Sequence, residues 1–170
     1  MTQEFLVEEN LLCSQSVIEA CPKDCSQFII ITDDNVQPLY AATLKEHLEK
    51  NHLSTDIITI PHGEASKSRE MVSQIQDQLL DLGCGRDTCI LALGGGVITD
   101  LAGFVAATYC RGVPVIYLPT TLLAMVDAAH GGKTGVNTPH GKNLIGVFSH
   151  PKAIISDIST LKTLDRKSVV

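Results

Sequence analysis

Glycine-rich turns with charged neighbours are concentrated between residues 94 and 146. The first is the triplet Gly94-Gly95-Gly96, which follows the apolar run 89–93 and precedes Asp100. Glycine allows a backbone to approach a ligand closely, and a helix that starts after such a turn directs its N–H groups and the positive end of its dipole at anions. The triplet therefore predicts a pyrophosphate site, although a tight structural turn explains it equally well when it is taken alone. It also departs from the common dinucleotide fingerprint, because Thr99 occupies the position of the last glycine.

Polar residues also follow three other predicted strands. They are Asp33 and Asn35 after residues 28–32, the segment 62–67 after residues 55–60, and Thr120 and Thr121 after residues 113–118. Because ligands of open α/β sheets bind at the carboxyl ends of the strands, we expect these residues and the triplet to form one rim.

The elements that position this rim alternate between strand and helix. Strands are predicted at 28–32, 55–60, 89–93, 113–118 and 153–157, helices at 38–50, 66–82, 98–109 and 120–129, and a turn-rich hairpin at 133–147. Ser66 is expected to cap the second helix. Alternation with continuous apolar strands indicates an α/β fold, a Rossmann-like parallel sheet with helices on both faces, in one domain over residues 1–170.

Composition excludes several classes of function. The net charge of −6 disfavours sequence-independent nucleic-acid binding, which needs a basic face. The apolar runs are too short to span a bilayer, and the amino terminus has no secretory signal, so we expect a cytoplasmic protein that binds neither nucleic acid nor membrane. The six cysteines contain no Cys-x-x-Cys pair and are expected to be reduced thiols.

Three histidines recur at intervals of ten, at positions 130, 140 and 150. This spacing fits neither one helix face nor a close pair of turns, so we predict no metal ligand among them. Lys133 lies between glycines and is interpreted as a donor to phosphate or carboxylate, with a solvated hairpin lysine as the alternative. Asp127 follows an apolar helical stretch and is interpreted as a ligand-binding residue, with a helix cap as the alternative.

Taken together, these motifs resemble the 3-dehydroquinate synthase family. The resemblance extends from about residue 31 to residue 167 and depends on six segments: 32–36, 63–68, 94–100, 119–124, 131–137 and 141–146. It implies an amino-terminal NAD-binding α/β domain followed by a helical domain, with NAD and a divalent metal, zinc or cobalt, as cofactors. It also implies a homodimer that acts on a small sugar phosphate in the shikimate pathway of aromatic amino acid biosynthesis.

The resemblance assigns roles to matching positions. The residues implied in the cofactor site are Asp33, Asn35, Glu64, Lys67, Gly95, Gly96, Val97, Asp100, Thr120, Thr121, Leu123, Asp127, Lys133, Lys142, Thr160, Leu161, Lys162 and Thr163. Among them, Asp33 and Asn35 are expected at the adenosine end. The residues implied in catalysis and substrate binding are Asp127, Lys133, Asn143 and Arg111, of which Arg111 is expected to reach the substrate phosphate of a neighbouring subunit.

Three departures from the family pattern bear on function. Thr99 stands where the family usually has glycine, and Ala128-Ala129-His130 stands where it has Ser-Ser-Val or similar. The family's metal ligands, one Glu and two His, are expected beyond Val170. We therefore expect this chain alone to bind no catalytic zinc and to make no dehydroquinate.

Three alternatives remain open at this point. One is another sugar-phosphate cyclase of the same superfamily, which the segment 131–137 fits less well. Another is an iron-dependent alcohol dehydrogenase, which favours Asp-x-Ala-Lys where this chain has Asp100-Leu101-Ala102-Gly103. The third is a non-catalytic NAD-binding module.

Overall fold

The computed structural model describes residues 4–165 and contains a parallel sheet of six strands in the order β1-β8-β5-β4-β2-β3. The strands are β1 (Glu4–Glu8), β2 (Gln27–Asp33), β3 (Ser54–Ile60), β4 (Thr88–Gly94), β5 (Val115–Pro119) and β8 (Ala153–Asp157). The α-helices are α1 (Gln15–Ala20), α2 (Ala42–Lys50), α3 (Arg69–Asp81) and α4 (Gly96–Thr108). A separate antiparallel hairpin joins β6 (Lys133–Thr138) to β7 (Gly141–Phe148).

Short helical turns complete the chain. They are η1 (Gln37–Ala41), η2 (Glu64–Ser66), η3 (Tyr109–Arg111), η4 (Ala124–Ala128) and η5 (Ile158–Thr163).

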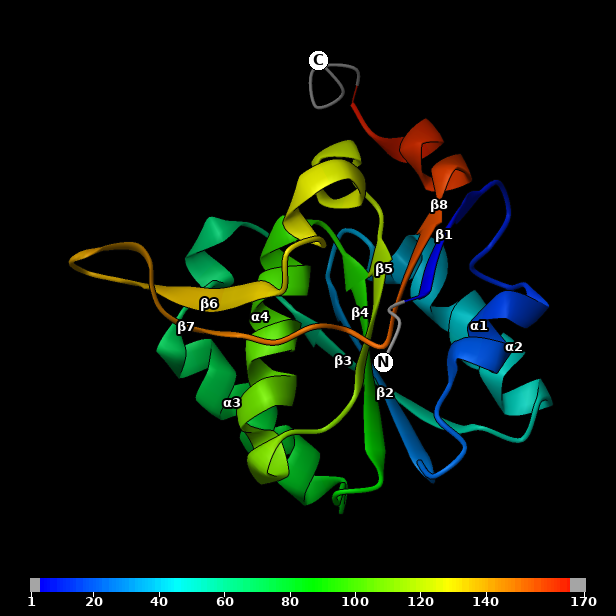
Figure 1. The fold of residues 1–170 in the computed structure, drawn as a ribbon, viewed down its shortest axis with the longest axis horizontal. Coiled ribbons are helices and arrows are strands. Elements are labelled where there is room, and N and C mark those ends of the chain that lie inside the picture. The colour runs from blue at the N-terminus through cyan, green and yellow to red at the C-terminus, as the bar shows by residue number, and fades with distance from the viewer. Residues whose placement is uncertain (1–3, 166–170) are drawn as a thin grey trace.

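Helices cover both faces of the sheet, as Figure 1 shows with α1 and α2 on one side and α3 and α4 on the other. Alternate residues of β2 supply the two cores, because successive side chains of a strand point to opposite faces. Phe28 and Ile30 belong to the core that contains the buried leucines of α2, whereas Ile29 and Ile31 belong to the core under α3 and α4. The prediction of a parallel α/β sheet covered on both faces is confirmed.

The order of the strands reverses between β2 and β4. From β2 the chain moves outward to β3, and it then returns to the other side of β2 to form β4 and β5. At such a reversal the connections leave the neighbouring strands on opposite faces, which opens a crevice at the carboxyl ends of the strands. This crevice lies between Asp33 and the glycine triplet.

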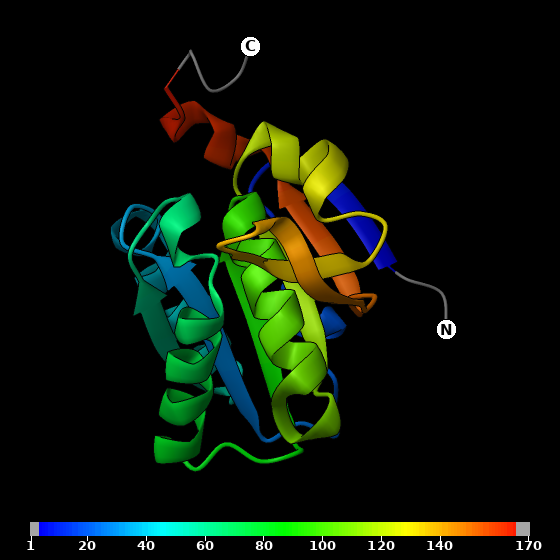
Figure 2. The same cartoon turned by 90° about the vertical axis from the view of Figure 1, so that its left-hand side faces the viewer.

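The hairpin lies across the outer surface of α4, as Figure 2 shows. Close approach depends on Gly103, which is buried in α4. A Cβ at this position would lie 2.1 Å from the Tyr117 hydroxyl oxygen and 2.5 Å from Cγ2 of Thr134 on β6. The absence of a side chain at Gly103 therefore allows β5 and the hairpin to pack against the same turn of the helix.

Some element boundaries differ from the prediction. The cap of α3 is Ser68, whose hydroxyl accepts a hydrogen bond from Met71 N, and the prediction of Ser66 is wrong. Ser66 belongs to η2, and its hydroxyl donates to the carbonyl of Pro61. Ser68 is the residue with the extended backbone that an N-cap requires. The strand β1 and the turn η5 were not predicted.

Candidate functional site

A cavity of about 590 Å³ occupies the crevice where the strand order reverses, and we call it the crevice pocket. Residues from five segments line it, and those assigned to the site from the sequence are Asp33, Asn35, Gly95, Gly96, Val97, Thr120, Thr121 and Thr163. The structure thus brings the ends of β2, β4 and β5 together with η5 at one place. Of the rim expected from the strand ends, Asp33, Asn35, Gly95, Gly96, Thr120 and Thr121 line this pocket, and the segment 62–67 contributes only His62 and Gly63.

The glycine turn lines the floor of the crevice pocket, where a side chain at Gly95 or Gly96 would crowd its neighbours. A Cβ on Gly95 would lie 3.1 Å from Cγ2 of Thr121, and a Cβ on Gly96 would lie 3.2 Å from Cβ of Ala128. Gly95 is the N-cap of α4, so the first N–H groups of a 13-residue helix begin at the pocket. Such N–H groups and the helix dipole favour an anion such as a pyrophosphate.

Acidic residues stand at the opposite wall, where β2 ends. One carboxylate oxygen of Asp33 accepts hydrogen bonds from Asn35 N at 3.0 Å and Val36 N at 2.9 Å, which fixes the turn. The neighbouring Asp34 accepts from His62, with 2.7 Å between its carboxylate and the ring nitrogen Nδ1. This hydrogen bond lowers the pKa of Asp34. The two turns after β2 and β3 are therefore tied to each other beside the pocket.

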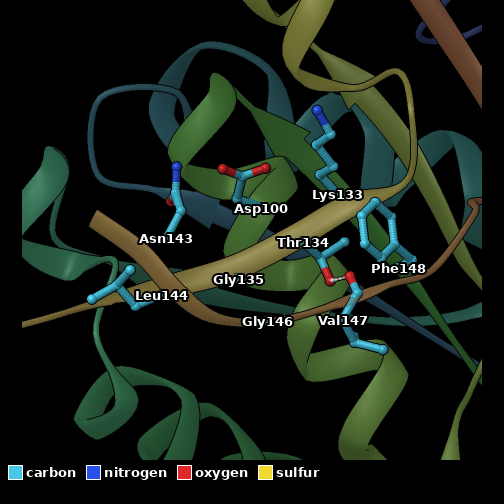
Figure 3. A pocket seen from close by; sticks show the side chains of 9 residues that line it. All are labelled: Asp100, Lys133, Thr134, Gly135, Asn143, Leu144, Gly146, Val147 and Phe148. Atoms are coloured by element: carbon cyan, nitrogen blue, oxygen red, sulfur yellow. Dashed lines mark hydrogen bonds between the residues drawn. The ribbon is translucent and has the colours of Figure 1, made fainter. Parts of the chain in front are cut away.

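A second cavity of about 300 Å³ lies between α4 and the hairpin, and we call it the hairpin pocket. Figure 3 shows Asp100, Lys133 and Asn143 on one side of the hairpin, with Leu144 and Val147 on the other side. The hairpin pocket thus combines a carboxylate, an ammonium group and an amide, which suits a ligand with both anionic and hydroxyl groups.

The Asp100 side chain forms an ion pair with Lys67, which is itself buried. Burial raises the pKa of Asp100, and the hydrogen bond and charge of Lys67 oppose this effect. The cation therefore helps to keep a carboxylate ionised in a partly desolvated place.

The hairpin is also tied to the end of β3. Asn137 N donates to the carbonyl of Lys67 at 2.9 Å, and its side-chain amide donates to Glu64 at 2.7 Å. The Lys142 ammonium lies 3.8 Å from the same carboxylate, and Asn143 N donates to the Asn137 side chain at 3.0 Å. Glu64, Lys67 and Asn143 are thus linked through Asn137, and Lys142 lies beside the same Glu64 carboxylate.

Other predicted residues line neither pocket. Thr160 is buried, Leu161 lines an apolar groove beside η4, and Lys162 lies 3.9 Å from Glu9. Leu123 and Asp127 are exposed in and before η4. Their assignment to the site stays a prediction.

Arg111 is exposed at the end of α4 that is remote from the glycine triplet. It precedes β5, so it lies at the amino ends of the strands, whereas the crevice pocket lies at their carboxyl ends. Arg111 therefore does not reach the pockets of its own subunit.

Two departures from the family pattern are located in packed positions. Thr99 is fully buried, and its hydroxyl donates to the carbonyl of Gly96. His130 contacts the carbonyl of Met125 through Nε2 at 2.8 Å and packs edge-on against Phe5. Neither side chain lines the crevice pocket or the hairpin pocket.

Sequence reasoning missed Tyr40 as a lining residue of the crevice pocket, whereas His62 belongs to the segment 62–67 that it expects on the rim. The pattern of the sequence assigns Tyr40 only to a helix over residues 38–50. The proximity of Tyr40 to η5, more than a hundred residues later, left no signal in local patterns.

Within residues 4–165, no three His, Cys, Asp or Glu side chains gather in a way that could hold a metal ion. The described residues therefore do not fit a divalent metal by themselves. The glycine cradle beside the acidic turn fits a dinucleotide.

Comparison with known proteins agrees with this geometry. The family model described as "3-dehydroquinate synthase N-terminal" matches residues 57–170. The chain belongs to the 3-dehydroquinate synthase family. Membership in this family decides against the iron-dependent alcohol dehydrogenases that the sequence left open.

A 3-dehydroquinate synthase from Dehalococcoides mccartyi is 45% identical to this chain over 164 residues. The alignment covers 96% of this chain and 46% of the relative. The chain thus spans less than half the length of this relative. Among solved structures, 2-deoxy-scyllo-inosose synthase complexed with carbaglucose-6-phosphate, NAD+ and Co2+ has a TM-score of 0.88 at 31% identity. The alignment covers 96% of this chain and 45% of that chain.

A second solved structure is the 2-epi-5-epi-valiolone synthase ValA from Streptomyces hygroscopicus subsp. jinggangensis 5008, with NAD+ and Zn2+ bound. Its TM-score is 0.87 at 32% identity, and the alignment covers 99% of this chain and 46% of that chain. In the described part of this chain, no helix has the length and apolar character needed to cross a membrane.

Proposed function

We propose that this chain is the NAD-binding half of a 3-dehydroquinate synthase. The observation that supports this most strongly is the crevice pocket, where a glycine turn and helix N-terminus face an acidic turn at the point where the strand order reverses. Dinucleotides bind α/β sheets at such points, with the pyrophosphate at the helix N-terminus. Two solved relatives that carry NAD+ support the same cofactor here.

The cofactor would lie with its adenosine end near Asp33 and Asn35 and its pyrophosphate over Gly95 and Gly96. Its nicotinamide end would then be directed toward Asp100, which lines the hairpin pocket. The Lys67–Asp100 ion pair would hold the carboxylate in place at this junction. The two pockets would thus serve the cofactor and the substrate respectively.

In the complete enzyme, the proposed reaction converts 3-deoxy-D-arabino-heptulosonate 7-phosphate into 3-dehydroquinate and inorganic phosphate, which is a lyase reaction. NAD, when bound, supplies a transient hydride acceptor that leaves no net redox change. The Lys133 ammonium and the Asn143 amide would bind the phosphate or carboxylate of the substrate, because both are donors in the hairpin pocket. Asp127 is proposed as a further substrate contact.

Turnover is proposed for the whole enzyme, with the chain described here contributing the cofactor site and part of the substrate site. We further propose a homodimer in which Arg111 binds the substrate phosphate of the neighbouring subunit. Its exposed position, remote from both pockets of its own chain, supports a role across an interface. In full-length protein, mixed dimers of R111A and K133A subunits should recover part of the activity, and stable mixed dimers without recovery contradict this role.

Calorimetric titration of this chain with NAD tests the cofactor assignment. We expect saturable binding, with G95V weakening it because the added side chain closes the floor of the crevice pocket. Binding that G95V leaves unchanged contradicts the pyrophosphate assignment, and the absence of NAD binding contradicts the proposed function.

Another sugar-phosphate cyclase activity is the second candidate, since the two solved relatives are named as a 2-deoxy-scyllo-inosose synthase and a 2-epi-5-epi-valiolone synthase. Phosphate release by the full-length enzyme from the heptulosonate phosphate, measured beside other sugar phosphates, separates the two. Preference for another sugar phosphate favours the second candidate.

A further inference from the structure

Two walls of the crevice pocket come from segments that are far apart in the sequence. Tyr40, in the turn before α2, forms part of one wall, and Thr163, at the end of η5, forms part of the other. The Tyr40 hydroxyl joins these walls directly. It donates to the carbonyl of Thr160 at 3.3 Å and lies 2.8 Å from the Thr163 hydroxyl.

The beginning of η5 is fixed independently of Tyr40. The Asp157 carboxylate accepts a hydrogen bond from Ser159 N, and its carbonyl accepts one from the Thr160 hydroxyl at 2.7 Å. These contacts hold the first turn at the end of β8. The last turn of η5 reaches the pocket, and the Tyr40 hydroxyl contacts it from the other side of the pocket.

Tyr40 lies at the adenosine end of the proposed cofactor site. Its backbone N–H donates to the carbonyl of Val36, in the turn that Asp33 caps. The hairpin pocket, where the nicotinamide end is proposed, is lined by other segments. Any effect of Tyr40 on the site therefore concerns the adenosine half.

We infer that Tyr40 is a positioning residue for the adenosine half of the cofactor. Its hydroxyl sets the distance between the η5 wall and the wall formed by the turn after β2, so that η5 is in place before the nucleotide binds. Preorganisation of this kind increases affinity because the ligand does not have to order the wall. This inference rests on the proposed function, since it requires a dinucleotide in the crevice pocket.

The decisive variant is Tyr40→Phe, which keeps the ring and removes both hydroxyl contacts. The matched control is Tyr109→Phe, because the Tyr109 hydroxyl donates to the carbonyl of Cys84 at 2.7 Å in the buried core away from the pocket. Both variants lose a tyrosine hydrogen bond, but only Tyr40→Phe changes the wall. Each is titrated with NAD, AMP and nicotinamide mononucleotide, and its thermal unfolding is recorded.

We expect Tyr40→Phe to weaken NAD and AMP binding by about 5- to 10-fold, the loss typical of one or two modest hydrogen bonds. Nicotinamide mononucleotide affinity should stay unchanged, and Tyr109→Phe should lower the melting temperature without changing any affinity. Equal AMP affinity in wild type and Tyr40→Phe overturns the inference, as does an equal loss of affinity in the control.

A double-mutant cycle with Thr163→Val adds a second measurement. If the two hydroxyls act together, the double variant should bind AMP no more than about 2-fold more weakly than the weaker single variant, whereas full additivity overturns a shared role. Wild-type protein that binds no nucleotide at all refutes the proposed function itself. If instead the wild type binds the nucleotide and Tyr40→Phe binds it equally well, only this inference is refuted.

Discussion

The ammonium group of Lys67 donates a hydrogen bond to the carboxylate of Asp100 and so joins the turn after β3 to α4. The Lys67 side chain is only 5% exposed and that of Asp100 is 20% exposed. A charge removed from water to this extent needs a partner of opposite sign. The pair therefore matters for stability as well as for the proposed cofactor site.

Replacement of Lys67 by methionine should lower the free energy of unfolding by about 3 kcal/mol, because it leaves a partly buried carboxylate unpaired. Asp100→Asn should be costly for the same reason. The double variant should lose less than the sum of the two, since it contains neither unpaired charge. Urea unfolding of the four proteins measures this coupling, and strict additivity contradicts a functional ion pair.

The stability of Lys67→Met should depend on pH. Burial already raises the pKa of Asp100, and without Lys67 it should rise further. An acid whose folded pKa lies above its unfolded value of about 4 is stabilised in its protonated form, so the fold loses stability as pH rises through that range. The difference in stability between wild type and Lys67→Met should therefore be smaller at pH 4 than at pH 7.

Gly95→Ala should weaken NAD binding, because the added methyl group enters the floor of the crevice pocket. The new Cβ would also lie 3.1 Å from Cγ2 of Thr121, which could disturb the protein itself. Thr121→Ser removes that methyl group and serves as the matched background. If Gly95→Ala weakens binding in this background as well, the loss arises from the ligand. If Gly95→Ala in the Thr121→Ser background binds NAD as tightly as Thr121→Ser alone, the added methyl group does not meet the ligand, and the ligand binds elsewhere.

The hydrogen bonds of the Asp157 carboxylate predict that the protein loses stability in acid. This buried carboxylate accepts hydrogen bonds from Asn10 N, Leu12 N and both donors of Ser159. Burial raises its pKa, but the hydrogen bonds outweigh burial and hold the pKa below its ordinary value. Because the folded pKa is depressed, the stabilisation is present above the unfolded value of about 4 and is lost as pH falls through the folded value.

Asp157→Asn should therefore lower the free energy of unfolding by about 2–3 kcal/mol at pH 7, as expected for hydrogen bonds to a charged group. The difference from wild type should shrink in acid. Denaturant titrations at pH 7 and pH 3 measure it, and a difference that stays constant between the two contradicts the assignment.

Gly103→Ala should destabilise the protein by about 2–3 kcal/mol through overpacking. The added Cβ would lie 2.1 Å from the Tyr117 hydroxyl, and Tyr117→Phe leaves Cζ as its nearest atom in that ring, at 3.2 Å. The phenylalanine should thus restore part of the lost stability. Alone, it should cost little, because the Tyr117 hydroxyl has no hydrogen-bond partner among the described residues. No rescue in thermal unfolding contradicts the packing argument.

Sequence reasoning located the rim of the crevice pocket because the signals are local. Asp33, Gly95 and Thr120 each follow directly after an apolar strand, and parallel pairing brings such positions to one edge. The contribution of Tyr40 could not be predicted, because it depends on contact with a segment 120 residues later. The cap of α3 was misplaced by two residues, since Ser66 and Ser68 carry the same signal and only the backbone distinguishes them.

The place of β1 in the sheet has a consequence for how the chain folds as it is made. Its neighbour is β8, with Glu4 opposite Ala153, so the first strand of this sheet along the chain pairs with the last. Asp157, at the end of β8, also accepts hydrogen bonds from Asn10 N and Leu12 N in the loop after β1. Until β8 has been synthesised, β1 lacks its partner strand, and the apolar side chains Phe5 and Val7 remain without the strand beside which they lie. The inner strands can associate earlier, whereas this edge closes last, so nascent chains halted before β8 should be the forms most prone to aggregate.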